Sequence, residues 1–332
     1  MHPFVSLIIP CYNEARTISL LLNALHAQTY PLECMEIIIA DGMSTDSTRE
    51  VIANFQRQHP NIHLRVVDNP RRHIPAALNC ALQAASGEII VRMDAHAVPA
   101  PDYVARCVDD LQAGRGVNVG GVWEIRPGAP GVMAQGIALA AAHRFGVGDA
   151  HYRHAEEARR VDTVPFGAFY RSLVERIGAF DETLLTNEDY EFNARIRQSG
   201  GAIWLNPDIR AVYYARPTLA ALARQYARYG FWKWRMLQRY PETLRWRQAL
   251  PPIFVLGLLV LAALSVWWPE ARLLLGLQIG TYLALLALVG LQTARRQRSL
   301  CVGLFTSLAI AVMHLVWGSA FLWSMIKSIF AR

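Results

Sequence analysis

Short apolar runs alternate with amphipathic segments through the first two-thirds of the chain. The runs over 5–10, 36–41, 63–68 and 88–94 are typical of buried strands. Helical periodicity appears over 18–25, from Asp46 or Ser47 onward, and over 74–85 with Gly87 as the expected C-cap. Strands and helices that alternate every ten to fifteen residues or so predict βαβ units and a largely parallel α/β sheet.

The pattern continues less regularly after residue 100. We expect a helix over 101–113, a strand over 117–123, a helix over 137–145 and a mobile loop over 151–160. A capping box at Ser172 and Glu175 predicts a short helix that ends at Gly178. Asn187 is the expected cap of a helix that runs to Gly200.

From residue 250 onward the chain is mostly apolar. The stretches Leu250–Trp268, Leu273–Leu291 and Leu300–Ile326 are each long enough, at roughly 18 residues or more, to cross a bilayer core of about 30 Å. A large buried helical core is the alternative, but such helices usually keep a polar face. We therefore predict three domains: a globular domain over 1–216, amphipathic interfacial helices over 217–249, and three transmembrane helices over 250–332.

Basic residues on either side of these stretches predict the orientation in the membrane. No signal peptide is visible, so we expect the N-terminal domain in the cytosol. Arginines and lysines precede the first stretch and separate the second from the third, which places the short turn near Pro269 and the C-terminus outside. Lys327 and Arg332 oppose this placement of the C-terminus.

The net charge of +7 comes with basic residues that gather around the apolar stretches. Anionic membrane lipids explain this distribution better than nucleic acid does, so we expect membrane lipids and no nucleic acid as partners. The five cysteines lack CxxC spacing, which favours reduced thiols over a disulfide frame or a zinc site.

Acidic residues follow strand-like runs at three distant positions, Asp41, Asp94 and Asp189. Since strand ends in an open α/β sheet face one crevice, these carboxylates are expected to converge on one ligand. Asp41 suits a base edge or a ribose, or simply a tight turn. Asp94 and His96 can hold a divalent ion, where the imidazole favours Mn²⁺ or another transition ion over Mg²⁺. Alternatively, His96 contacts phosphate directly or is a solvated side chain. Glu188 and Asp189 open a helix, where the dipole keeps a carboxylate pKa low; Asp189 is either a general base or a capping residue.

Two basic clusters are weaker candidates. Arg71 and Arg72 either neutralise a diphosphate or form a solvated patch. Gln225, Arg228 and Tyr229 either bind the pyrophosphate and sugar of a lipid-linked acceptor or anchor the chain at the membrane interface. The sequence has no Walker loop, GxGxxG, GxSxG or Ser-His-Asp pattern, so hydrolase and dinucleotide functions have poor support.

The spaced motifs VSLIIPCYNEARTI, GMSTDST after Asp41, the ALN segment, RMDAHA and NEDYEFNARIRQSG together resemble family-2 glycosyltransferases of the GT-A type over residues 4–230. The DAHA motif and the apolar C-terminus are most similar to succinoglycan-type exopolysaccharide glycosyltransferases. This resemblance implies a GT-A, Rossmann-like mixed sheet, a nucleotide-diphospho-sugar donor, most often a UDP-sugar, a divalent metal, Mn²⁺ or Mg²⁺, and inversion at the anomeric carbon.

The resemblance also implies residue roles. Pro10, Tyr12, Glu14 and Asp41 would surround the base and ribose, Asp94 and His96 would hold the metal and diphosphate, and Asp189 would be the general base. Glu188 would bind substrate beside it, and Gly167 would permit close approach of the acceptor. The family usually carries Asp in place of His96, and Tyr229 replaces the tryptophan of the processive QxxRW motif, which favours addition of one sugar.

We therefore hypothesise a glycosyltransferase of the bacterial inner membrane that faces the cytoplasm and moves a hexose from a UDP-sugar to a polyprenyl-diphosphate-linked saccharide. Transfer to polyprenyl phosphate, as in dolichol-phosphate-mannose-like enzymes, is one alternative. A non-catalytic membrane scaffold of polysaccharide export is the other.

Overall fold

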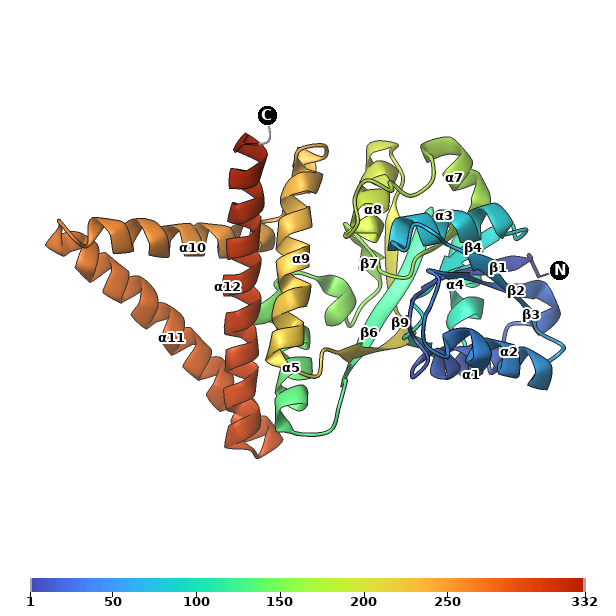
Figure 1. The fold of residues 1–332 in the computed structure, drawn as a ribbon, viewed down its shortest axis with the longest axis horizontal. Helices are drawn as coiled ribbons and strands as arrows, with labels where there is room; N and C mark the ends of the chain where they lie inside the picture. The colour runs from blue at the N-terminus through green and yellow to red at the C-terminus, as the bar shows by residue number, and fades with distance from the viewer. Residues whose placement is uncertain (1, 331–332) are drawn as a thin grey trace. The chain divides into compact units, whose positions relative to one another are not determined.

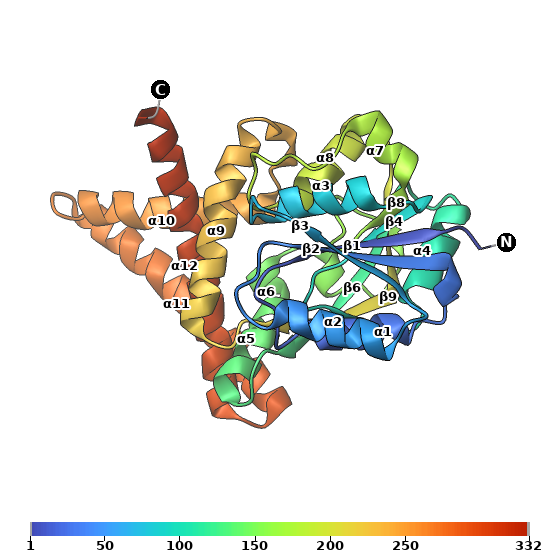
Figure 2. The same ribbon diagram turned by 45° about the vertical axis from the view of Figure 1, so that its right-hand side comes forward.

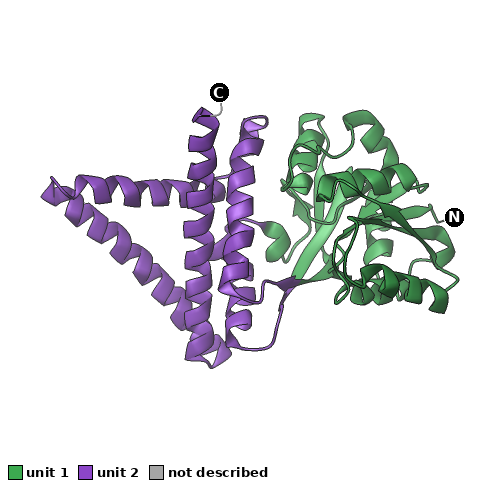
Figure 3. Cartoon of the chain, in the orientation of Figure 1, with its two compact units in different colours: residues 1–124, 151–213 green, residues 125–150, 214–332 purple. Residues whose placement is uncertain are grey.

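The computed structural model describes residues 2–330 and divides the chain into two compact units. The first unit comprises residues 1–124 and 151–213, and the second comprises residues 125–150 and 214–332 (Figure 3). The second unit therefore includes a segment, 125–150, that precedes the apolar C-terminus by about a hundred residues of chain.

The first unit is built on one mixed sheet. Within residues 2–330 the strands are β1 (Val5–Cys11), β2 (Met35–Asp41), β3 (His63–Asp68), β4 (Ile89–Arg92), β5 (Val98–Pro99), β6 (Asn118–Pro127), β7 (Arg159–Arg160), β8 (Ala168–Tyr170) and β9 (Ile203–Ala215). Their order is β3-β2-β1-β4-β8-β6-β9-β5, with β7 paired to β9. The first four are parallel, and the pairs β4–β8, β6–β8, β5–β9 and β7–β9 are antiparallel.

Helices cover both faces of this sheet (Figures 1 and 2). They are α1 (Ile18–His26), α2 (Thr48–Gln58), α3 (Ile74–Ala84), α4 (Tyr103–Gln112), α7 (Arg171–Ile177) and α8 (Glu188–Gln198). Alternate residues of a strand point to opposite faces, so Leu7 packs in the cluster that contains α1, α2 and α4. Its neighbour Ile8 packs in the cluster that contains α3, α7 and α8.

Several predicted boundaries need correction. The C-cap of α3 is Ala85, and Gly87 instead lies against β1, where an added Cβ would be 2.5 Å from the Ser6 nitrogen. Helix α7 begins at Arg171 with Tyr170 as N-cap, so the predicted capping box is not formed; its end at Gly178 is confirmed. The predicted loop over 151–160 includes a short strand, β7, because its arginines pair with β9.

The second unit is helical. Its helices are α5 (Val132–Ala142), α6 (Arg144–Val147), α9 (Leu219–Leu237), α10 (Trp246–Leu264), α11 (Pro269–Gln297) and α12 (Leu300–Phe330). Within the described residues, α10, α11 and α12 are the three helices long and apolar enough to cross a membrane. The prediction of three such segments is therefore confirmed at the level of length and composition.

Candidate active site

The carboxyl ends of the parallel strands form one edge of the sheet in the first unit. In the pairing of β1 with β2, Cys11 lies beside Asp41, and Pro10 lies one step earlier beside Ala40. Asp94 and His96 follow β4, which pairs with the other side of β1. The topology therefore brings the predicted donor-binding residues to neighbouring strand ends, as expected for an open α/β sheet.

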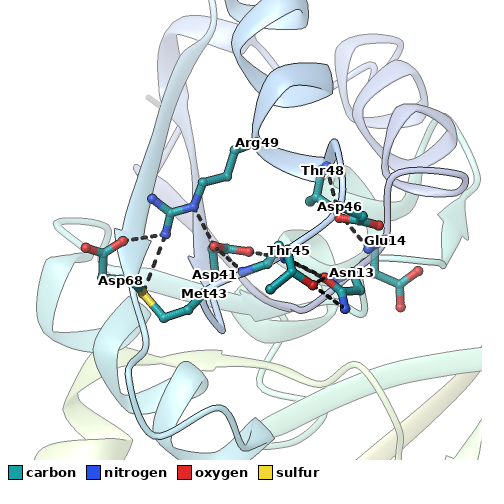
Figure 4. Close-up of polar contacts among 10 residues, drawn as sticks. Asn13, Glu14, Asp41, Met43, Thr45, Asp46, Thr48, Arg49 and Asp68 are labelled. Carbon is teal, nitrogen blue, oxygen red and sulfur yellow. Dashed lines mark hydrogen bonds and ion pairs between the residues drawn. The ribbon is translucent and has the colours of Figure 1, made fainter.

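Asp41 is fully buried, and its carboxylate is engaged by the protein itself (Figure 4). Oδ2 accepts from the Ser44 amide at 3.0 Å and from Nε of Arg49 at 2.6 Å, and Oδ1 accepts from the Ser44 hydroxyl at 2.5 Å. Arg49 also pairs with Asp68, the last residue of β3. Asp41 thus fixes the loop after β2 and draws Arg49 toward the sheet edge.

The loop after β1 is bound to the loop after β2. The backbone amide of Asn13 donates to the Ser44 hydroxyl at 2.8 Å, and the Thr45 amide donates to the Asn13 side chain at 2.8 Å (Figure 4). Asn13 and Met43 both have left-handed backbone angles, with φ of 54° and 62°. Residues held in such conformations require over-determining contacts, which these hydrogen bonds supply. Tyr12 stays exposed at this edge, with 45% of its surface accessible.

Glu14 and His96 contact each other across this edge. Nδ1 of His96 lies 3.1 Å from Oε1 of Glu14, and both side chains are about one quarter exposed, at 28% and 24%. Metal-binding histidines commonly donate their second ring nitrogen to a carboxylate, which orients the ring. This contact fixes the orientation of the imidazole at the strand edge.

Arg92 lies at the centre of the acidic cluster. Its guanidinium is 2.9 Å from Asp94, 3.0 Å from Glu188 and 3.3 Å from Asp189, while only 4% of the Arg92 side chain is exposed. It also lies over the ring of Phe166, 5.1 Å from the centroid. Carboxylates from two distant segments, Asp94 after β4 and the neighbouring Glu188 and Asp189 on α8, therefore share one buried cation.

This cluster perturbs the acid–base behaviour of Asp189. The pKa of Asp189 is raised to about 7: burial is the largest cause, Arg92 opposes it, and the charges of Glu188 and Asp94 add to it. Burial lowers the pKa of Arg92, but the charges of Asp189, Asp94 and Glu188 outweigh it and raise the pKa overall. The sequence had led us to expect a low pKa for Asp189 from the helix dipole. Desolvation dominates instead.

Helix α8 is fixed by buried polar contacts behind Asp189. Nδ2 of Asn193 donates to the Thr163 hydroxyl at 2.9 Å, and Oδ1 of Asn193 accepts from Asn118 at 2.7 Å. Asn187 occupies the N-cap position in a left-handed conformation with φ of 71°, but its side chain makes no capping hydrogen bond. Gly167 is buried with its potential Cβ position 2.3 Å from Asn118 Oδ1, so packing against Asn118 explains the glycine.

The basic loop before α3 is connected to the loop before α8. Arg71 forms an ion pair with Glu182, whose other oxygen accepts from Asn79 at 2.9 Å. Arg72 is exposed and has a left-handed backbone with φ of 58°. Arg71 therefore has a protein partner in this structure, and it remains 67% exposed.

The third predicted group lies in the second unit, on α9. Nε2 of Gln225 donates to the hydroxyl of Tyr229 at 2.9 Å, one helical turn away, and Arg228 is exposed. These three residues share a helix, as their spacing requires.

The candidate metal ligands at the strand edge, Asp94 and His96, fit a metal that takes few of its ligands from the protein. Among the described residues, no group of three or more histidine, cysteine or acidic side chains is arranged to hold an ion. Asp94 and His96 are both partly exposed, at 21% and 28%, and Glu14 orients the imidazole. A carboxylate and an imidazole are ligand types that suit Mn²⁺.

Sequence reasoning missed Arg92 and Arg49. Arg92 is the one charged residue inside the apolar run IIVRM, and a charge at a buried strand position is rarely placed there without partners. That position was the available signal. Arg49 had none, because an arginine in the first turn of an amphipathic helix is ordinary.

Comparison with known proteins places the chain in a family. The family model described as glycosyl transferase family 2 matches residues 6–177. Succinoglycan biosynthesis protein ExoA of Rhizobium meliloti (strain 1021) is 28% identical over 318 residues, 95% of this chain and 93% of the relative. A dolichyl N-acetyl-α-D-glucosaminyl phosphate 3-β-D-2,3-diacetamido-2,3-dideoxy-β-D-glucuronosyltransferase of Methanococcus voltae is 28% identical over 267 residues, 80% of this chain and 83% of the relative.

Solved structures give the same result for the fold. Mannosyltransferase PcManGT from Pyrobaculum calidifontis, in complex with GDP-Man and Mn²⁺, superposes with a TM-score of 0.64 at 25% identity, over 95% of this chain and 88% of that one. Staphylococcus aureus TarS 1–349 in complex with UDP has a TM-score of 0.50 at 18% identity over 69% and 65%. The fold is that of GT-A glycosyltransferases, and the chain belongs to glycosyl transferase family 2.

Proposed function

We propose that this chain is a membrane-anchored inverting hexosyltransferase. It transfers a hexose from a UDP-sugar to a polyprenyl-diphosphate-linked saccharide during exopolysaccharide synthesis. The observation that carries the proposal is the cluster of Asp94, Glu188 and Asp189 around the buried Arg92. In this cluster Asp94, a proposed metal ligand, and Asp189, the proposed general base, both contact the same arginine.

The donor side of the site comprises the loops after β1 and β2. Tyr12 is exposed there for contact with the base, beside Pro10 at the end of β1. Asp41 acts on the ribose side through the loop that it fixes, since its oxygens are bonded to Ser44 and Arg49. Arg71 and Arg72 supply positive charge for the diphosphate, and Arg71 exchanges Glu182 for phosphate oxygen when the donor binds.

Asp94 and His96 would hold the divalent metal, Mn²⁺ or Mg²⁺. When bound, such an ion neutralises charge on the departing diphosphate. Glu14 keeps the imidazole of His96 in one orientation through the contact of 3.1 Å at Nδ1. Arg92 holds Asp94 at 2.9 Å, which limits the rotation of that carboxylate.

Asp189 is the proposed general base. An acceptor hydroxyl beside the anomeric carbon transfers its proton to the carboxylate while its oxygen attacks from the face opposite the diphosphate. The new glycosidic bond forms as the bond to the diphosphate breaks, so the configuration inverts. A pKa of about 7 suits this role, because a base titrating near the working pH is both ionised and able to accept a proton.

The acceptor assignment rests on the membrane helices and on the relatives. The names of two relatives refer to succinoglycan biosynthesis and to a dolichyl-linked sugar. We propose that Gln225, Arg228 and Tyr229 on α9 bind the diphosphate and sugar of the acceptor. Glu188 and Gly167 are proposed to lie beside the acceptor hydroxyl, next to the general base. We place the chain in the bacterial inner membrane with the domain over 1–216 in the cytoplasm, followed by interfacial helices and the apolar region from residue 250.

Transfer assays with the detergent-solubilised full chain test this function. UDP-hexoses and GDP-mannose are supplied with either a polyprenyl-diphosphate-linked oligosaccharide or polyprenyl phosphate, with and without Mn²⁺. We expect UDP-dependent transfer to the diphosphate-linked saccharide, and loss of at least about two orders of magnitude in Asp189→Asn. Asp102→Asn, at the N-cap position of α4, is the matched control, because its carboxylate pairs with Arg106 at the surface.

Other results would reject parts of the proposal. Transfer only to polyprenyl phosphate identifies the alternative acceptor class. Turnover retained in Asp189→Asn removes the base assignment. Calorimetry that detects no nucleotide binding with or without Mn²⁺ supports the non-catalytic scaffold.

A further inference from the structure

Helix α12 is covered along one side by other helices of the second unit. Near its start, Gly136 of α5 packs so closely that an added Cβ would lie 2.6 Å from Cβ of Phe305. Further on, Gly230 of α9 approaches the backbone of Trp317, with 2.3 Å from its potential Cβ to the carbonyl oxygen. Near the end of α12, Trp234 of α9 donates to Ser328 at 3.0 Å. Figures 1 and 2 both show α9 and α12 side by side.

The helix that covers α12 carries a row of arginines on its other face. Arg224, Arg228 and Arg235 are exposed and follow each other by four and seven residues, which places them on one side of α9. The opposite side, with Leu222, Gly230 and Met236, is buried. A helix with arginines along its exposed face cannot lie alongside a membrane span through the hydrocarbon core, because each charge would be desolvated there.

Helices α10 and α11 form a hairpin with a different character. Leucines and isoleucines along both helices are exposed, and the turn presents Trp267 and Trp268 with 71% and 55% of their surfaces accessible. Tryptophans concentrate at membrane interfaces. The 19 residues of α10 extend about 28 Å, enough to cross the core. Basic residues stand at the open end, Arg245 and Arg247 before or within the first turn of α10 and Arg295 and Arg296 at the end of α11.

Both legs of the hairpin contact α12 in their open halves. On α11 these contacts extend from the open end back to Tyr282, whose hydroxyl is 3.1 Å from Nδ1 of His314. Close to the start of α10, the carbonyl oxygen of Pro251 would be 2.5 Å from a Cβ on Gly318. Toward the end of α11, Gly290 faces Gly303, with 2.3 Å between the Gly290 carbonyl and a Cβ on Gly303. The open ends of a hairpin that crosses twice lie at the same face of the membrane. The stretch of α12 from Gly303 to Gly318, about 22 Å long at 1.5 Å per residue, therefore joins two points at one depth.

We propose that α12 lies in the plane of the membrane surface and does not cross the bilayer. Only α10 and α11 cross, and the C-terminus stays on the same side as α9. The outer face of α12 then points toward the bilayer core and contacts lipid acyl chains. This face exposes Leu304, Leu308, Leu315 and Trp323. Lys327 near one end and Arg298 before the other both face the headgroup region. This placement removes the conflict between Lys327 and an external C-terminus.

Spin-label depth measurements on the full chain in lipid nanodiscs test the proposal. Cys301, the exposed cysteine of α12, is first replaced by serine. Single nitroxides are then placed at Leu304, Leu315 and Ile326, all exposed on α12. An in-plane helix predicts the same ratio of oxygen to nickel-chelate accessibility at the three sites. A spanning helix predicts a clear maximum at Leu315, and that result would overturn the proposal.

Helix α11 provides the matched control. Nitroxides at Leu274, Leu283 and Leu291, also exposed, should show the deepest position at Leu283 because this helix crosses. A flat profile on α11 would contradict the hairpin. Neither measurement depends on glycosyl transfer, so the topology and the proposed function fail independently.

A reporter fusion gives a second readout that uses no spin labels, so perturbation of the structure by a label cannot affect it. Green fluorescent protein or alkaline phosphatase is fused after Arg332 of the full chain in a Gram-negative host. We expect fluorescence and no phosphatase activity, since the C-terminus is on the cytoplasmic side. Active phosphatase with a dark fluorescent protein would show three crossings and reject the proposal.

Discussion

Nη1 of Arg92 lies 3.3 Å from Oδ2 of Asp189, and the same guanidinium lies 2.9 Å from Asp94. Asp94 is on the side of the proposed metal, and Asp189 is the proposed base. One buried cation therefore contacts both of the carboxylates to which we assign a function. A change of charge on either side alters the electrostatic field at the other, since buried charges are weakly screened.

The raised pKa of Asp189 predicts the pH dependence of transfer. Only the ionised carboxylate accepts a proton, so kcat/KM should rise about tenfold per pH unit below pH 7 and level off above it. Initial rates from pH 5 to 9 check this. An acidic limb near pH 4 would contradict it.

The free energy of unfolding should fall as pH rises. Because the pKa of Asp189 is raised from 3.8 in the folded state, its contribution to stability is full below pH 3.8 and is lost as pH rises through 7.

Two substitutions should shift the acidic limb of the pH profile of kcat/KM in opposite directions. Arg92→Met removes a positive charge and should shift the limb to higher pH, whereas Glu188→Gln removes a negative charge and should shift it to lower pH. The comparison separates electrostatics from general damage to the site, which would lower the plateau without moving the limb. Shifts of both variants in the same direction would show that Arg92 does not act through its charge.

Glu14→Gln tests the orientation of His96. The amide keeps the shape of Glu14 but loses the charge that fixes the imidazole, so affinity for Mn²⁺ should fall about 10- to 100-fold. Titration of Mn²⁺ followed by electron paramagnetic resonance measures this without turnover. Glu50→Gln on the exposed side of α2 is the control and should bind Mn²⁺ as the unaltered chain does. Equal affinity of both variants would exclude Glu14 from the metal site.

Gly121 of β6 should not tolerate a side chain. A Cβ at this position would lie 1.7 Å from the carbonyl oxygen of Ile209 on β9, so the strands must move apart. We expect Gly121→Ala to reduce the free energy of unfolding by at least about 2 kcal/mol, as overpacking does. Gly276→Ala, where no heavy atom lies within 4 Å, should be neutral or slightly stabilising. Thermal unfolding of both variants in detergent makes the comparison.

The sequence predicted the order of strands and helices well because their hydrophobic periods are strong. Strands β1, β2 and β4 are buried on both faces, and each contains a continuous apolar run in the sequence, which predicted a buried strand. Asp94 follows β4 as predicted, but Asp189 lies in the first turn of α8 and not at the end of a strand, so the contact of both with Arg92 did not follow from the strand-edge rule.

Other features depend on contacts between distant segments and were not predictable. The buried position of Arg92 appears only when α8 packs beside β4, and the raised pKa of Asp189 follows from that packing. Helix ends were also misjudged, since Gly87 is needed for close packing against Ser6 and not for a C-cap. Local propensity signals such as the Ser172 capping box yielded to tertiary contacts of α7.

The ion pair between Arg71 and Glu182 joins the loop before α3 to the loop before α8. A phosphate that recruits Arg71 must take it from Glu182, and Glu182 lies seven residues before Asp189 along the chain. Binding of the proposed donor would thereby change a contact of the segment that leads to Asp189, the proposed base. Under the proposed function, we therefore expect the sugar donor to bind before the acceptor.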